Sequence, residues 1–198
     1  YIPFRKVKGL METCRRHGME VFPWLMEFWG DLDAIGDDKT HTLEEYERYF
    51  GCGYQLQLLK RYHLNLRGRA LQTYKEYMKP IVTQEVLQNS MPCRELQGIH
   101  HFHIDLYGNF IPQSCAGLSI NFKDLIQGAA PEKYQVLHTL DSMGIRGLYD
   151  LAVSRYGFVP KESYCGKCDL CYDIRRYLIM DLKLELPDLQ PFGHYIYM

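Results

Sequence analysis

The sequence lacks an excess of charge of either sign. Among its 198 residues, 23 are Lys or Arg and 24 are Asp or Glu, and the formal net charge is -1. The two kinds are mixed along the chain, with no basic tail and no polybasic segment. We therefore expect neither nucleic acid nor a membrane surface among its partners.

Long apolar runs are also missing. The longest, such as residues 21–26, are far too short to cross a bilayer, and no signal-peptide pattern opens the chain. Proline- and glycine-rich stretches, which are typical of flexible linkers, do not occur either. These absences predict a soluble, cytoplasmic protein built as one ordinary domain or two small ones.

Cysteine is present in an odd number, and its spacing is informative. There are seven cysteines, and three of them form the segment Cys165-Gly-Lys-Cys168-Asp-Leu-Cys171. Proteins built on disulfides are generally smaller, secreted and even in cysteine count. Clustered thiols in a cytosolic protein therefore indicate a metal site.

The cysteine pattern predicts a metal site with five candidate ligands. A Cys-x2-Cys pair lets two thiolates approach one metal from a tight turn, and a third cysteine two residues further on is common in iron–sulfur proteins. Soft thiolates favour an iron–sulfur cluster or an all-thiolate zinc site over hard cations, and spacing leaves both open. The candidate ligands are Cys93, Cys115, Cys165, Cys168 and Cys171.

The first part of the chain predicts α/β structure. Helical spacing over residues 5–17 ends at Gly18, and the apolar segment 20–28 is typical of a buried strand. A helix followed by a strand is the unit of a parallel α/β layer. A loop is expected over 30–40.

Further helices are expected before residue 90. Thr42 and Glu45 fit a capping box at the start of one, and Pro80 is expected to kink or split another. The predicted helices cover residues 42–50, 54–62 and 71–89.

The pattern changes after Pro92. Polar and apolar residues alternate from His101 to Tyr107, and Gly108-Asn109 is typical of a two-residue, glycine-first turn. A β-hairpin is therefore predicted over 99–115. Helices are expected at 122–126, 132–143, 145–156 and 173–184, with an irregular tail after residue 187.

This layout resembles the SPASM or "twitch" extension of radical SAM enzymes. In that module a cysteine, a β-hairpin with glycine at its turn, a second cysteine, a long gap and a Cys-x2-Cys pair follow one another. Residues 104–115, Ile-Asp-Leu-Tyr-Gly-Asn-Phe-Ile-Pro-Gln-Ser-Cys, are similar to the family's hairpin. Gly68-Arg69-Ala70 resembles the junction between the family's partial barrel and this module.

Three features depart from the family pattern. The spacing from Gly108 to Cys115 is longer than usual, and the cysteine set is short, which favours one auxiliary cluster over two. The Cys-x3-Cys-x2-Cys motif that holds the SAM-cleaving cluster is absent. Either the catalytic half precedes Tyr1 or it has been lost.

The resemblance implies a fold and a function. It implies an α/β part of a partial barrel over 1–89, an α+β cysteine-rich module with a β-hairpin over 90–186, and a tail over 187–198. It implies an auxiliary [4Fe–4S] cluster in an enzyme that modifies a peptide or small molecule by radical oxidation. S-adenosylmethionine would bind with the missing half, and flavodoxin or ferredoxin would donate electrons.

Other residues are weaker candidates. Glu27 and Asp31 would follow the predicted strand, where α/β layers place ligand sites, and Arg67 and Arg69 suit a substrate anion or the SAM carboxylate. Arg67 and Arg69 also suit a structural ion pair.

Two alternatives to the radical SAM interpretation remain open. One is a four-cysteine zinc module without catalysis. The other is a hydrolase or dioxygenase with a metal on His101, His103 and Asp105, which alternate on one predicted strand face. A polar hairpin face is the simpler explanation of that last pattern.

Overall fold

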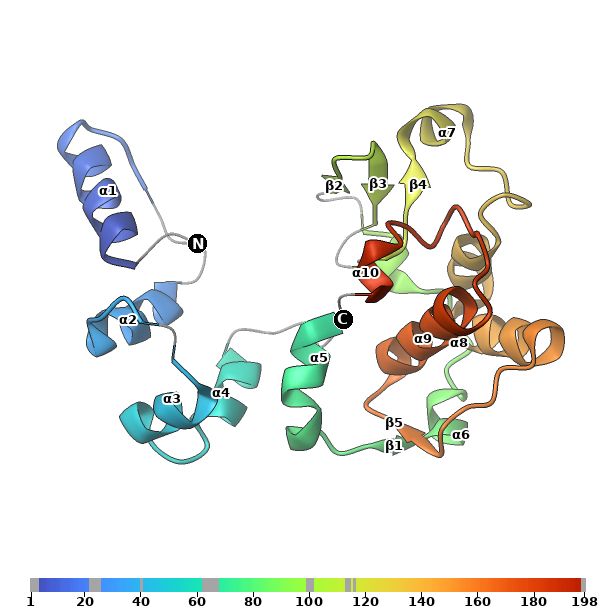
Figure 1. Cartoon of the computed structure of the whole chain (residues 1–198), viewed down its shortest axis with the longest axis horizontal. Helices are drawn as coiled ribbons and strands as arrows, with labels where there is room; N and C mark the ends of the chain where they lie inside the picture. Colours follow the sequence, from blue (N-terminus) through green and yellow to red (C-terminus); the bar gives the residue numbers. More distant parts are fainter. Residues whose placement is uncertain are drawn as a thin grey trace. The chain divides into compact units, whose positions relative to one another are not determined.

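A computed structural model describes residues 4–21, 26–39, 41–61, 68–98, 102–112, 115 and 117–196, without the side chains of residues 4, 26–29, 60, 61 and 69. The chain divides into two compact units, Tyr1–Leu64 and Asn65–Met198. Helices and short antiparallel sheets make up a mixed fold (Figure 1), in keeping with the α+β part of the expectation. No described helix has the length and apolar character needed to span a membrane.

The described part of the first unit is helical. The predicted capping box is confirmed, because Thr42 Oγ1 accepts from the N–H of Glu45 and Glu45 Oε2 accepts from the N–H of Thr42. Tyr54 is buried against Phe50 and donates its hydroxyl to Asp31 Oδ2 at 2.6 Å, which ties two helices together. The helices are α1 (Phe4–Arg16), α2 (Met26–Ile35), α3 (Leu43–Phe50) and α4 (Tyr54–Arg61).

The strand predicted over 20–28 is wrong where it can be compared, because residues 26–28 begin α2. The loop predicted over 30–40 is wrong up to residue 35 for the same reason, and residues 22–25 lie outside the described part. A short apolar run does not distinguish strand from helix by spacing alone. Polar residues also suit the exposed side of a helix, as Asp33 shows by pairing with Lys8 of α1.

In the second unit, Pro80 splits the predicted helix over 71–89. Proline lacks an N–H and clashes with the preceding turn, so a helix ends before it. Strand β1 follows and pairs with β5, and Thr83 donates its N–H to the carbonyl of Glu162. The elements are α5 (Gly68–Tyr74), η1 (Lys75–Tyr77), β1 (Ile81–Val82), α6 (Thr83–Val86) and β5 (Ser163–Tyr164).

The predicted hairpin is present, but its two-residue turn is wrong. β2 (His103–Ile104), β3 (Asn109–Ile111) and β4 (Ile120–Asn121) form an antiparallel sheet in that order. The N–H of Asp105 donates to the carbonyl of Asn109 at 3.0 Å, so residues 106–108 form a three-residue turn. Gly108 has a φ of 75°, because the last position of such a turn is left-handed.

Helices make up most of the rest. The two helical segments predicted around residue 144 are confirmed as α8, which is interrupted by a non-helical Gly144. A Cβ at Gly144 would lie 2.0 Å from the carbonyl oxygen of Met91. The elements are η2 (Arg94–Leu96), α7 (Phe122–Gln127), α8 (Gln135–Tyr156), α9 (Lys167–Arg176), the π-helical η3 (Tyr177–Asp181) and α10 (Gly193–Ile196).

The core of the second unit lies between α8 and α9. Leu148 of α8, together with Leu170 and Ile174 of α9, has no exposed surface. The residues after 187 belong to this core, since Leu189 and Tyr195 are also buried. The expected irregular tail therefore contains a short helix, α10, and packs into the fold.

Candidate metal centre

Helix α9 carries two of the predicted ligands. It begins at Lys167, so the helix predicted from residue 173 starts earlier and includes Cys168 and Cys171. Residues three apart lie on the same helix face. Gly166 precedes the helix with a φ of 141°, a backbone angle that side chains rarely adopt. Glycine therefore lets the chain enter α9 directly after Cys165.

Cys171 is a partly buried thiol on α9. It keeps a little accessible surface, but burial is the largest influence on its pKa and raises it. The guanidinium of Arg175 opposes this rise, whereas the neighbouring thiols of Cys168 and Cys93 add to it. A positive charge and two further sulfur groups therefore lie near Cys171.

Cys93 and Cys115 reach the same core from other segments. Cys93 precedes η2 and donates its N–H to the carbonyl of Leu140 in α8 at 2.9 Å. Cys115 follows β3, and its carbonyl accepts the N–H of Leu118 at 3.0 Å. Both side chains are partly buried and pack, as Cys171 does, against the hydrophobic core between α8 and α9.

Cys165 has a different setting. Its N–H donates to Asp169 Oδ2 at 2.9 Å. Burial raises the pKa of its thiol, and the charge of Asp169 raises it further, while Lys75 lowers it. The carboxylate disfavours a thiolate at this position.

Arg175 is a buried cation beside these thiols. Its side chain is 6% exposed, and its Nη1 donates to the hydroxyl of Tyr195 at 3.2 Å. Burial would lower the pKa of Arg175, but the charges of Tyr195, Cys171 and Cys115 outweigh it and raise the pKa. The guanidinium carbon lies 5.7 Å from the ring centre of Tyr172 and 5.9 Å from that of Tyr195.

Two polar atoms near Arg175 are buried without a hydrogen-bond partner in the described part of the chain. They are the hydroxyl of Tyr172 and Nε2 of His194, whose rings are 6.1 Å apart. Burial lowers the pKa of His194 to about 4, with the positive charge of Arg175 adding to the effect. Buried polar atoms normally have partners, so this region has hydrogen-bonding capacity that a bound group can use.

The cysteines do not form a closed site in this structure. All seven lie within the described residues, and none forms a disulfide. Among those residues no group of three or more His, Cys, Asp and Glu side chains is arranged to hold a metal ion. In the second unit, Cys93, Cys115 and Cys171 pack against the core beside α9, but the candidate ligands do not converge on one point.

Glu27 and Arg69 belong to different units of the chain. The backbone of Glu27 is in α2 of the first unit and that of Arg69 is in α5 of the second, and neither side chain belongs to the described part. Asp31 accepts a hydrogen bond from the hydroxyl of Tyr54, and this bond joins α2 to α4. Arg67 lies outside the described residues.

The hairpin residues have a structural explanation. Asp105 Oδ1 accepts from the N–H groups of Tyr107 and Asn109, at 2.8 and 3.0 Å. Burial would raise the pKa of Asp105, but these hydrogen bonds lower it below the usual carboxyl value. Asp105 therefore holds the turn, His103 is exposed on β2, and His101 lies outside the described residues.

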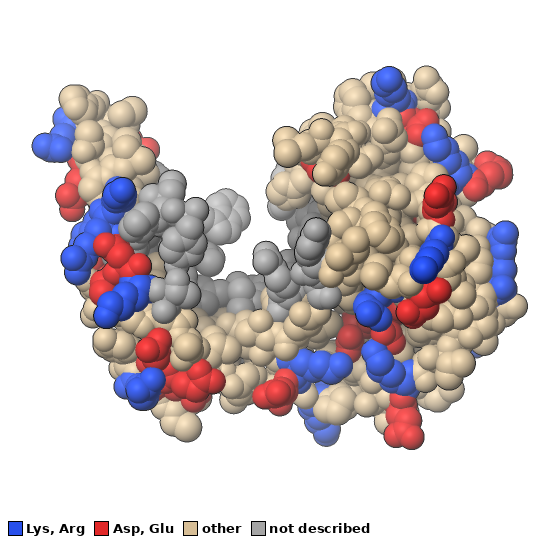
Figure 2. All heavy atoms as spheres, viewed as in Figure 1, with Lys and Arg blue, Asp and Glu red and all other residues tan. Residues whose placement is uncertain are grey.

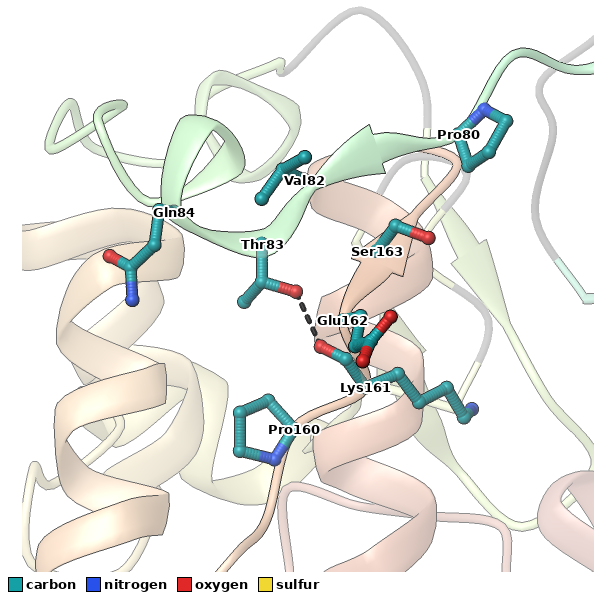
Figure 3. Close-up of a pocket in the computed structure, with 8 residues that line it drawn as sticks. All are labelled: Pro80, Val82, Thr83, Gln84, Pro160, Lys161, Glu162 and Ser163. Atoms are coloured by element: carbon teal, nitrogen blue, oxygen red, sulfur yellow. Dashed lines mark hydrogen bonds between the residues drawn. The ribbon is translucent and has the colours of Figure 1, made fainter.

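An open pocket of about 660 Å³ lies beside β1 and β5. Residues 80, 82–84 and 160–163 line it (Figure 3). Two of these residues are hydrogen-bonded, since the hydroxyl of Thr83 donates to the carbonyl of Lys161 at 2.6 Å. None of the cysteines lines this pocket, so the pocket and the candidate metal ligands have no residue in common.

Basic and acidic residues are interspersed on the face that Figure 2 displays, as the near-zero net charge leads one to expect. Ion pairs in the described part of the chain include Lys161 with Asp173 and Lys133 with Asp124. The displayed face therefore has a mixed charge pattern.

Comparison with known proteins identifies no relative of this chain. No protein-family model, no curated protein and no solved structure matches this chain.

Sequence patterns did not single out Arg175, Tyr195 or His194. The sequence contains one indication that Arg175 lies near the thiols. It is four residues after Cys171, so the two residues share one face of a helix. Tyr195 and His194 come from the C-terminal segment, and only folding brings them to α9.

Proposed function

We propose that this chain is the C-terminal part of a radical SAM enzyme and that its second unit holds an auxiliary [4Fe–4S] cluster. The observation that supports this best is that Cys93, Cys115 and Cys171 come from three separate segments and pack against one core. Cys168 joins them through its position on the same face of α9 as Cys171.

The donor chemistry suits an iron–sulfur group. Cysteine thiolates are the usual ligands of such clusters, and each thiolate of a four-iron cluster binds a different iron atom. The ligand sulfurs therefore stand further apart than four ligands of a single ion. The buried guanidinium of Arg175 offsets negative charge next to Cys171 and Cys115, which makes a thiolate-bound anionic group less costly to bury.

Four of the five candidate cysteines suffice, and we assign Cys165 as the spare one. Its strongest charged neighbour is the Asp169 carboxylate, which opposes the thiolate form that metal binding needs. The proposed ligands are Cys93, Cys115, Cys168 and Cys171.

The proposed activity is radical oxidation or modification of a peptide or small molecule. Glu27 and Arg69 remain proposed contacts for SAM or substrate. When bound, the cluster supplies one-electron transfer or a coordination site for substrate. This chain's residues hold the group, surround it with the core between α8 and α9, and place a fixed positive charge beside it.

The test is anaerobic purification with iron and sulfide analysis of the full chain and its Cys→Ser variants. We expect brown protein with four irons per chain (about the content of one [4Fe–4S] cluster). C171S should lose most of the iron, whereas C165S and C52S should keep it. Cys52 is a matched control because it is an exposed thiol in the first unit.

Two outcomes contradict the proposal. Colourless protein that contains one zinc per chain, lost in C171S, identifies the zinc module instead. Iron retained in C171S and lost in C165S rejects the assignment of ligands.

A further inference from the structure

Arg175 is held at a fixed position next to two of the proposed ligands. It lies four residues after Cys171 and seven after Cys168 on α9, so all three share one face of the helix. Its Nε is 3.4 Å from the carbonyl oxygen of Cys171. The side chain is 6% exposed, so little water screens its charge.

Tyrosines from two elements keep the guanidinium in this position. Tyr172 of α9 and Tyr195 of α10 present their ring faces to it. The hydroxyl of Tyr195 accepts from Arg175 Nη1 and donates to the carbonyl of Gly117 at 2.5 Å. Through Tyr195, the guanidinium is therefore tied to the segment that follows Cys115.

Gly117 allows this close packing. A Cβ at this position would lie 2.4 Å from Cδ2 of His194 and 2.8 Å from the hydroxyl of Tyr195. The C-terminal helix α10 can thus approach the Cys115 segment only because residue 117 has no side chain. The positive charge is consequently fixed by contacts from α9, α10 and the Gly117 backbone.

We propose that Arg175 is a positioning residue that raises the reduction potential of the metal group held by the neighbouring cysteines. This inference rests on the proposed function. Reduction adds one negative charge to a thiolate-bound cluster, and a nearby fixed cation stabilises the more negative state more strongly. The reduced form therefore gains stability relative to the oxidised form.

The test is a redox titration of the anaerobically purified full chain, followed by electron paramagnetic resonance. R175M, which replaces the guanidinium with an apolar side chain, should lower the midpoint potential. We expect at least a tenfold change in the oxidised-to-reduced equilibrium, about 59 mV for a one-electron couple. R175K keeps the charge and should shift the potential less.

Arg176 provides the matched control. It is the next residue of α9 but is exposed, so water screens its charge and R176M should leave the potential unchanged. A wild-type potential in R175M with full iron and sulfide content overturns the inference while leaving the proposed function intact. A wild-type protein without iron and sulfide overturns both.

Folding effects are separated by a second neutral variant. If R175M does not retain iron, R175Q takes its place in the titration with the same expected decrease. If both neutral variants lose iron and R175K retains it, the positive charge at residue 175 stabilises the bound metal group. If R175K loses iron as well, a role for the positive charge is contradicted.

Discussion

Asp188 Oδ2 accepts a hydrogen bond from the backbone N–H of Leu137 at 3.0 Å, although 51 residues separate them. Leu137 lies in the first turn of α8, where N–H groups have no partner within the helix. Asp188 itself is fully buried. A carboxylate from the C-terminal segment therefore caps the helix against which Cys93 packs.

Removal of this cap should destabilise the fold. D188A leaves the N–H of Leu137 without its acceptor, and we expect the free energy of unfolding to fall by about 1–2 kcal/mol. D188N keeps an acceptor oxygen and should lose less. Urea unfolding followed by circular dichroism measures both, and equal losses in the two variants contradict the capping role.

The same residue predicts a pH dependence. Burial raises the pKa of Asp188 in the folded protein, against the opposing effect of backbone hydrogen bonds from Leu137 and Val136. The protonated form is thus favoured on folding, and its stabilising contribution is complete below the unfolded pKa of about 3.9. The contribution disappears as pH rises through the folded pKa.

D188N has no such titration. The unfolding free energy of D188N, measured relative to the wild type, should therefore rise as the pH increases from acidic to neutral values. A difference between the two proteins that does not vary with pH rejects this interpretation.

Asp105 should show the opposite dependence. Because hydrogen bonds from Asn109 and Tyr107 outweigh burial and lower its pKa, its contribution is present above the unfolded pKa of about 3.9. It is lost as pH falls through the folded pKa. The N–H of Asn109 donates to Asp105, and the protection factor of this amide against hydrogen exchange should fall at acidic pH in the wild type but stay constant in D105A.

Gly117 should tolerate no side chain. In G117A the Cβ would overlap His194, and the backbone φ of 81° adds strain. We expect a loss of at least about 2 kcal/mol in unfolding free energy. Gly157 is the control, since it also has positive φ but open space where a Cβ would lie, and G157A should cost only about 1 kcal/mol.

Gly144 should matter for the metal site as well as for stability. A Cβ at Gly144 would overlap the carbonyl of Met91, two residues before Cys93, and should displace this proposed ligand. We expect G144A to unfold at lower urea concentration and to retain less iron per chain. G128A, at another positive-φ glycine with open surroundings, should keep the wild-type iron content.

Local patterns predicted several elements correctly. The capping box at Thr42 and Glu45, the break at Gly144 and the end of a helix before Pro80 depend on residues close together in sequence. Such features follow from the chemistry of a single turn. The apolar run before α2 was ambiguous because burial of either a strand or a helix produces it.

By itself, the sequence determined the spacing of the cysteines, the presence of a hairpin and where most helices of the second unit lie. Only the tertiary structure decided which charges and hydroxyls surround those thiols. Folding brings Arg175 to Cys171, Tyr195 to Gly117 and Asp188 to Leu137. Such contacts depend on how α8, α9 and the C-terminal segment pack together, which residue spacing along the chain does not encode.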